Sequence, residues 1–438
     1  MYPLKPLKVY AHESVRGDEL CMNRIENVLG PINRSTDELV WIDEDNLPEI
    51  VQELSELWPP DEDPDDVPVT FTRPLVFTRM YLGEGDPTEE SVGWPKDTDE
   101  GMANAIVGNF KPIQAYHPYE KDQVEDRVCW PTWDFATMMG CPHGCHYCGH
   151  GKNGKFMTLA ANVEDFVETV VPRAFEKYPW QKCFRLQGWS AEQAAFEPEY
   201  GAYDLITRKM AEHDRYVYFH TAGSYVEWLE EIEHRDRVIG IFSMSAPRTS
   251  ATYEPGAGDP LERFDAGGKC NEMGVPVRYK FKPMIPIDGW REDYARSIKH
   301  ALEVSQPESI GFCVIMWMNL DELGRRIDIS KLDPEYVQAA RDAADEMEGN
   351  VCAPFPHHVR KEIYEWFIDE IRKYDEDVKL FISTESREMW DELAEKLGQD
   401  PDSFFCGCSS VAPPGGKVEL SEGCPHSTYS PLKEPAEK

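Results

Sequence analysis

The chain has 438 residues, of which 41% are apolar and 29% charged, a composition that fits one large or two to three ordinary globular domains and excludes a disordered protein. Asp and Glu number 81 against 45 Lys and Arg, a net charge of -36, so nucleic acid and anionic membranes are not expected partners. The longest apolar run, Gly311 to Met318, is too short to span a bilayer, and the polar N-terminus lacks a signal peptide. These features predict a cytoplasmic protein.

The first 125 residues are expected to form an irregular extension. A helix is predicted at Leu47 to Leu57, and little else in this part is periodic. The stretch from Trp58 to Asp66 is acidic and interrupted by prolines, which interrupt both helices and sheets. We expect this stretch to be a solvated loop.

From Thr132 onward, short apolar runs alternate with amphipathic stretches of helical length. The runs are Trp133–Met138, Cys183–Leu186, Tyr216–His220, Val238–Met244, Val277–Phe281 and Ile310–Trp317. The helical stretches are Val163–Tyr178, Tyr203–His213, Tyr225–Glu233, Asp259–Met273 and Glu292–Val304. This alternation predicts an α/β fold with a parallel sheet, which closes as a barrel or partial barrel or stays open.

A last unit is predicted after residue 346, with helices at His358–Lys373 and Arg387–Leu397 around a strand at Val378–Ile382. The tail after Gln399 is rich in Gly, Pro, Ser and Cys. We therefore divide the chain into an N-terminal extension (1–125), a barrel (126–345) and a C-terminal βα unit with its cysteine-rich tail (346–438).

Three cysteines, Cys141, Cys145 and Cys148, lie directly after the first predicted strand of the series. Their C-x3-C-x2-C spacing allows three thiolates to bind a 4Fe-4S cluster and leaves the fourth iron open to another ligand. A structural zinc ion with a histidine as its fourth ligand is the alternative. The histidines close enough in sequence are His143, His146 and His150.

This spacing after a strand of a βα series is identified as the signature of the radical S-adenosylmethionine (SAM) superfamily. Within it, the chain resembles the spore photoproduct lyase family (DNA repair photolyase-like) from Thr132 to Cys408. The motifs that carry the resemblance are Cys145–Cys148, Tyr253–Gly256, Leu261–Arg263, Met273–Val277, Lys282–Pro286, Gly289–Trp290 with Tyr294, and Val378–Ser386 with Trp390. The resemblance implies a partial (β/α)6 TIM-like barrel with its active site at the carboxyl ends of the strands.

The resemblance also implies that SAM binds to the open iron. Positions that match its expected contacts are Tyr147, Gln187, Ser190, Glu192, Ser243 and Ser245. The backbone of Tyr147 would face the adenine, and Ser190 with Glu192 would hold the amino group. Ser243 would contact the ribose or the carboxylate. For the serines, ordinary hydrogen bonding at strand ends and turns is the alternative.

Three departures from the family pattern concern the return of hydrogen to the product. The segment Gly188–Ser190 lacks the family's thiol, Gly149 replaces a tyrosine, and Thr221–Ser224 lacks a lysine. Together with the net charge of -36, these departures argue against DNA repair.

Other cysteines are candidates for chemistry. Cys183 and Cys313 lie in predicted strands and are candidate hydrogen donors to a radical, although a buried free cysteine is more often a small apolar side chain. Cys406, Cys408 and Cys424 in the tail are a possible second site for an iron-sulfur cluster or zinc. The alternative is a tail that closes the fold without metal.

The expected function is that of a radical SAM enzyme, in which a 5′-deoxyadenosyl radical abstracts hydrogen from a small molecule or a peptide. A one-electron donor such as flavodoxin or ferredoxin would be its protein partner. The first alternative is a lyase that repairs nucleic acid, and the second is a zinc-stabilised binding module without enzymatic activity. The first alternative would draw a basic surface from Arg185, Arg248, Arg278, Lys280 and Lys282.

Overall fold

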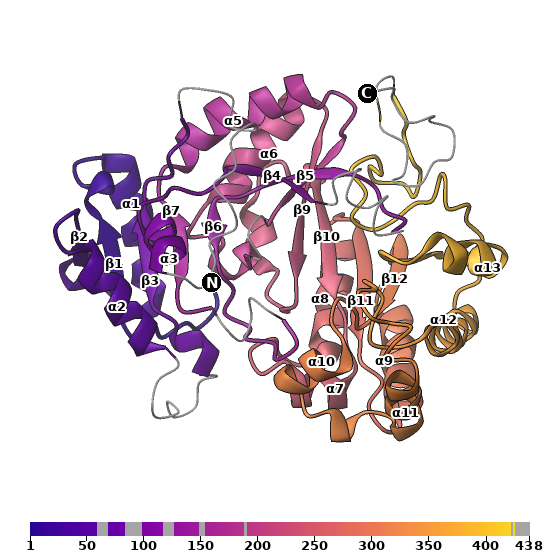
Figure 1. The fold of residues 1–438 in the computed structure, drawn as a ribbon. Helices are drawn as coiled ribbons and strands as arrows, with labels where there is room; N and C mark the ends of the chain where they lie inside the picture. The colour runs from indigo at the N-terminus through magenta and orange to yellow at the C-terminus, as the bar shows by residue number, and fades with distance from the viewer. Residues whose placement is uncertain are drawn as a thin grey trace, which may run out of the picture.

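The computed structural model describes residues 1–58, 69–83, 99–116, 127–148, 154–187, 191–421 and 424, which form two β-sheets with helices packed on them (Figure 1). The predicted loop lies outside the described residues from position 59 onward. In the described part of the chain, no helix combines the length and the apolarity that crossing a bilayer requires.

The smaller sheet has the strand order β2-β1-β3-β7-β6. Its strands are β1 (Val9–His12), β2 (Val40–Ile42), β3 (Leu75–Thr78), β6 (Met138–Met139) and β7 (Met157–Ala160). Pairing is parallel except between β6 and β7. The first 125 residues are therefore not an irregular extension. Its short strands in this part of the chain do not show the regular alternation with amphipathic stretches that identifies the strands after Thr132, so the pattern does not predict them.

The larger sheet has the strand order β13-β12-β11-β10-β9-β8-β5-β4. Its strands are β4 (Ile113–Tyr116), β5 (Thr132–Phe135), β8 (Cys183–Leu186), β9 (Tyr216–Thr221), β10 (Val238–Ser243), β11 (Val277–Met284), β12 (Ser309–Val314) and β13 (Lys379–Ile382). All neighbours pair in parallel except β4 with β5. The predicted parallel α/β sheet is confirmed.

Helices follow most strands and cover the sheets. They are α1 (Glu19–Leu29), α2 (Leu47–Leu57), α3 (Asp99–Ile106), α5 (Val163–Lys177), α6 (Ala202–Glu212), α7 (Pro247–Tyr253), α8 (Pro260–Glu272), α9 (Trp290–Val304), α10 (Leu320–Arg326), α11 (Pro334–Asp342), α12 (His357–Arg372) and α13 (Arg387–Leu397). In Figure 1, α1, α2 and α3 accompany the smaller sheet, whereas α12 and α13 lie at the β13 end of the larger one.

Two predicted elements differ from the structure. The run Trp133–Met138 divides into β5 and β6, which belong to different sheets. The predicted helix Tyr225–Glu233 forms only a 3-10 turn at Glu227–Glu231. The division of the chain at residues 125 and 345 stays a prediction.

Strand β11 shows how the larger sheet separates its two faces. Tyr279 and Phe281 point to the helices, where they contact the ring of Phe264. Side chains alternate along a strand, so Lys280 and Lys282 point to the opposite face. A parallel sheet covered by helices is usually apolar on both faces, so this lysine face indicates a polar interior with a function.

The C-terminal tail closes this polar face at the amino ends of the strands. Arg278 is fully buried and donates to the carbonyl oxygens of Gly407 (3.1 Å) and Ala412 (2.8 Å). The backbone N–H groups of Lys182 and Cys183 donate to the carbonyl of Ser410, at 2.8 and 3.0 Å. The candidate site lies at the other edge of the sheet, at the carboxyl ends of the strands.

Candidate functional site

The three-cysteine loop follows β6 and is held in place by the Tyr253–Gly256 segment at the end of α7. The N–H of His146 donates to the carbonyl of Tyr253 at 2.8 Å, and the N–H of Gly256 donates to the carbonyl of His143 at 2.9 Å. The ring nitrogen Nδ1 of His143 lies 2.7 Å from the carbonyl oxygen of Gly256. The two motifs of the resemblance are therefore one structural unit.

Two glycines permit this close packing. Gly144 has φ +64°, and a Cβ atom there would lie 2.0 Å from Cγ2 of Thr70. At Gly256, a Cβ atom would lie within 2.8 Å of backbone oxygens of Pro142 and His143. Neither position accepts a larger residue without displacement of the loop.

A buried ion pair is linked to the three-cysteine loop by a hydrogen bond. Arg263 of α8 and Glu254 lie 2.7 Å apart and are 1% and 6% exposed. Burial raises the pKa of Glu254, but Arg263 outweighs this effect and the pKa lies below its usual value. The ionised carboxylate also accepts a hydrogen bond from the hydroxyl of Tyr147 at 3.0 Å. Because Tyr147 lies between two of the cysteines, this network orients the loop.

The cysteine thiols suit a cluster better than a single zinc ion. Thiolates around one tetrahedral zinc lie about 3.8 Å apart, given Zn–S bonds of about 2.3 Å. Among the described residues, the grouping of ligand atoms within 4.8 Å is Cys141, His143 and Glu192, and it contains neither Cys145 nor Cys148. The three thiols are thus spread more widely than one zinc requires. Burial raises the pKa of the Cys141 and Cys145 thiols, so metal binding must displace their protons.

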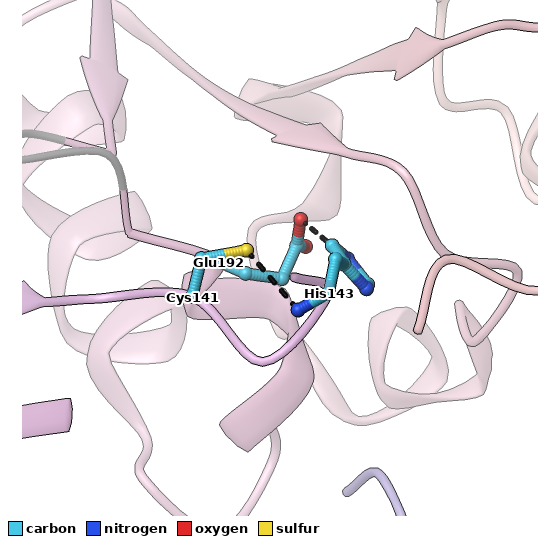
Figure 2. Close-up of side chains that lie close together, drawn as sticks. All are labelled: Cys141, His143 and Glu192. Atoms are coloured by element: carbon cyan, nitrogen blue, oxygen red, sulfur yellow. Dashed lines mark hydrogen bonds and ion pairs between the residues drawn. The ribbon is translucent and has the colours of Figure 1, made fainter. Parts of the chain in front are cut away.

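His143 is not a free metal ligand, because both of its ring nitrogens face acceptors. Figure 2 shows His143 beside Cys141 and Glu192, with Nε2 of the histidine 3.0 Å from Oε2 of Glu192. The other nitrogen faces the carbonyl of Gly256. A zinc ion on His143 would therefore have to displace one of these two contacts.

Two predicted SAM contacts carry buried oxygens that can accept a ligand. Glu192 receives hydrogen bonds on Oε2 from His143 and from the N–H of Ala222 (3.3 Å), whereas its Oε1 has no partner among the described residues. The side-chain oxygen of Gln187, directly after β8, is likewise buried without a described partner. Unpaired buried acceptors are costly, so they suit a bound donor such as an ammonium group. Ser190 lies outside the described residues.

The predicted serines lie at and just beyond the carboxyl end of β10. The hydroxyl of Ser243 lies 2.8 Å from Nε2 of His220, and its carbonyl accepts from Arg263 at 3.0 Å. Ser245 is fully buried, and its carbonyl accepts from Ser297 at 3.2 Å. The backbone of Tyr147 is anchored by Arg326, which donates to its carbonyl at 3.1 Å.

The basic residues expected to form a surface are arranged differently. Arg185, Lys280 and Lys282 enter the polar interior of the larger sheet, where Arg185 pairs with buried Asp134. Arg278 is clamped to the tail, and Arg248 is exposed and donates to the carbonyl of Asp288. These five residues do not form the expected basic surface, because strand alternation turns Arg185, Lys280 and Lys282 inward and the tail covers Arg278.

The remaining predicted cysteines do not join the cluster loop. Cys313 lies at the end of β12, with its sulfur 3.9 Å from the hydroxyl of Thr384. Cys183 packs against Tyr218 at the amino end of β8, beside the tail. The other predicted residues lie in the tail. The sulfurs of Cys406 and Cys408 lie 3.9 Å apart, and the ammonium of Lys280 donates to the sulfur of Cys408 at 3.2 Å. Cys424 is the last residue that the structure describes.

Sequence reasoning missed His220, which lies in the interior beside Ser243. Burial and the charges of Lys280, Arg185 and Lys282 hold the pKa of His220 well below its usual value, so the ring is neutral. The signal in the sequence was its place near the end of a predicted strand, where barrel enzymes carry functional residues.

Comparison with known proteins supports the motif-based resemblance. Residues 130–322 match the family model described as spore photoproduct lyase, which confirms that resemblance. A spore photoproduct lyase complexed with dinucleoside spore photoproduct has a TM-score of 0.56 and 14% identity, over 87% of this chain and 98% of that chain. A spore photoproduct lyase mutant with bound AdoMet and dinucleoside spore photoproduct has a TM-score of 0.56 and 13% identity over the same shares. No curated protein matches the sequence.

These matches correct the expectation about partners. We expected a small molecule or a peptide and no nucleic acid, but the matched structures contain a dinucleoside photoproduct. The expectation was wrong because a net charge describes the whole chain and not its interior. Lys280 and Lys282 lie on the inner face of a strongly acidic protein.

Proposed function

We propose that this chain, whose residues 130–322 form a spore photoproduct lyase domain, is a radical SAM lyase that acts on a photoproduct of two joined nucleosides. The observation that carries the proposal is the loop of Cys141, Cys145 and Cys148, held at the carboxyl ends of the parallel strands. Active sites of barrel enzymes lie at this end. The family match and the dinucleoside in the matched structures support this substrate class.

We infer that the larger sheet forms the partial barrel of this superfamily. The six parallel strands β5, β8, β9, β10, β11 and β12 follow one another in chain order, as a (β/α)6 barrel requires, and β13 adds a last strand. The polar residues of β11 face away from the helices, which supports an enclosed interior.

The proposed cofactors are a 4Fe-4S cluster on the three cysteines and SAM beside it. When bound and reduced, the cluster would supply the electron that cleaves SAM to methionine and a 5′-deoxyadenosyl radical, which abstracts hydrogen from the substrate. The unpaired oxygens of Glu192 and Gln187 would accept the ammonium group of SAM. Ser243 would contact the ribose or carboxylate, and the backbone of Tyr147 would face the adenine.

The first test is the metal content of anaerobically reconstituted protein together with 5′-deoxyadenosine release from SAM under dithionite. We expect about four irons per chain, release of 5′-deoxyadenosine, and conversion of dinucleoside spore photoproduct. About eight irons would assign a second cluster to Cys406, Cys408 and Cys424. Zinc without SAM cleavage would contradict the proposal and favour the structural module.

Cys313 is the better of the two candidate hydrogen donors. It lies at the carboxyl end of β12, and burial raises the pKa of its thiol, so it retains the hydrogen that it would donate. Burial also raises the pKa of Cys183 to about 12, but that residue lies at the opposite end of the sheet beside the tail. Transfer would break the S–H bond of Cys313, form a C–H bond on the substrate radical and leave a thiyl radical.

Thiol hydrogens exchange with solvent, so this route predicts deuterium in the repaired product when turnover occurs in D2O. The Cys313→Ala variant should lose most of this label, whereas Cys183→Ala should keep it. Mass spectrometry of the product measures both. A label unchanged in Cys313→Ala would remove Cys313 as the donor.

A further inference from the structure

Lys282 is a cation of the barrel interior with an unusual set of neighbours. Its ammonium donates to the hydroxyls of Ser383 (3.1 Å) and Thr384 (3.3 Å) and lies 4.7 Å from the ring centre of Trp317. Among the residues that the structure describes, no carboxylate pairs with it. An ammonium held by hydroxyls and an indole is positioned without being neutralised.

Two of the three residues that contact the ammonium of Lys282, Trp317 and Thr384, have strained backbones. Trp317 has φ +70° and Thr384 has φ +58°, a region that bulky and β-branched residues rarely adopt. They follow the neighbouring strands β12 and β13 at their carboxyl ends. The strain at Trp317 is maintained by a 2.8 Å hydrogen bond from its N–H to the carbonyl of Val351. Strain of this kind concentrates at ligand-binding sites.

Trp317 also offers its ring to a ligand. Its side chain is 45% exposed, although it lies beside the polar interior, just after the carboxyl end of β12. An exposed indole next to a cation matches the two needs of a nucleotide, because the base stacks on the ring and the phosphate binds the ammonium.

The charges around Lys282 leave it available to an anion. The neighbouring cations are partly compensated, since Arg185 pairs with Asp134 and Lys280 contacts the sulfur of Cys408. Glu385, the acidic residue that follows Thr384 in the chain, is occupied by Arg360 and Tyr364. His220 is neutral, because burial and the three surrounding cations lower its pKa. The interior therefore has excess positive charge at Lys282.

We propose that Lys282 and Trp317 form a subsite for one phosphorylated nucleotide unit of the substrate, with its phosphate on Lys282, Ser383 and Thr384 and its base on Trp317. This subsite rests on the proposed function, because it specifies how a substrate built from nucleotides is held. It requires that the enzyme distinguish a nucleotide from its uncharged nucleoside.

The test measures binding of thymidine 5′-monophosphate and of thymidine to the full, anaerobically reconstituted chain with SAM present, by isothermal titration calorimetry. The nucleotide should bind at least about tenfold more tightly than the nucleoside. Lys282→Met should remove this difference, and Lys282→Arg should keep most of it. Trp317→Ala should weaken both ligands by about tenfold, and Trp317→Phe by less. The matched control is Lys269→Met, since Lys269 pairs with Glu227 on the surface, and it should behave as the wild type.

Two results would overturn the subsite. The first is an unchanged preference for the nucleotide in Lys282→Met, and if SAM also binds this variant more weakly, Lys282 would be assigned to the carboxylate of SAM. The second is an equal loss of the preference in Lys282→Met and Lys282→Arg, which would indicate a packing role. Binding is measured without turnover, so failure of SAM cleavage would contradict the proposed function and leave this test intact.

Discussion

Replacing Cys141, Cys145 or Cys148 with alanine is expected to abolish iron binding and SAM cleavage together. A cluster held by three thiolates has no protein ligand to spare, and each ring nitrogen of His143 already lies within hydrogen-bond distance of an oxygen of Gly256 or Glu192. Iron content should fall from about four per chain to near zero, and 5′-deoxyadenosine release should fall to the level of the cluster-free protein. Iron analysis and chromatography of the nucleoside product measure the two effects.

The matched control for these variants is Cys270→Ala, which removes a buried thiol from α8. It should retain the iron and the SAM cleavage of the wild type, because Cys270 packs in the core and faces no candidate ligand. If a single loop variant retains about four irons and full cleavage, the assignment of the three cysteines is wrong.

Arg263→Met is expected to destabilise the protein by about 3–5 kcal/mol at neutral pH. The substitution leaves the buried carboxylate of Glu254 without its ion-pair partner and removes the hydrogen bonds that Arg263 makes around the loop. Its other acceptors are Ser250, Ala257, Gly258 and Ser243. Unfolding in urea, followed by circular dichroism, gives the difference in free energy.

The pH dependence of this effect has a definite sign. Arg263 holds the pKa of Glu254 below the usual carboxyl value of 4.5, so the pair stabilises the fold above that pH and loses this contribution as the pH falls through the lowered pKa. In the variant, the unpaired carboxyl takes up a proton more readily. The difference between the wild type and Arg263→Met should therefore shrink in acid.

A surface pair provides the control for this second prediction. Arg291 and Glu362 form an exposed ion pair, and Arg291→Met should cost about 0–1 kcal/mol with little change in pH dependence. A loss in Arg263→Met no larger than that of Arg291→Met would show that the buried pair does not stabilise the loop.

The departures from the family pattern concern residues that would return hydrogen to the product radical. Two of the three departures, at Gly188–Ser190 and Gly149, lie outside the described residues. For the third, no lysine follows β9, but Lys280 and Lys282 reach the same interior from β11. The interior cations thus come from β11, which is separated from β9 by β10 in the sheet.

Local patterns in the sequence predicted the strands and helices after Thr132 and the cluster motif. The spacing of Cys141, Cys145 and Cys148 predicts a cluster-binding loop within eight residues, and the alternation of apolar runs with amphipathic stretches predicts the parallel α/β sheet that the structure has. A helix was expected around Leu47 to Leu57, and α2 lies there, because an apolar face of period 3.6 is visible within a single segment.

Only the tertiary structure decided which distant residues meet. The smaller sheet joins β1, β3 and β7 from widely separated parts of the chain. Lys282 meets Trp317 and Thr384 because β11, β12 and β13 are neighbours whose carboxyl ends lie at one edge of the sheet. The same arrangement places cations inside a protein of net charge -36. A sequence records total charge and local period, whereas the pairing order of strands determines which charges face one another.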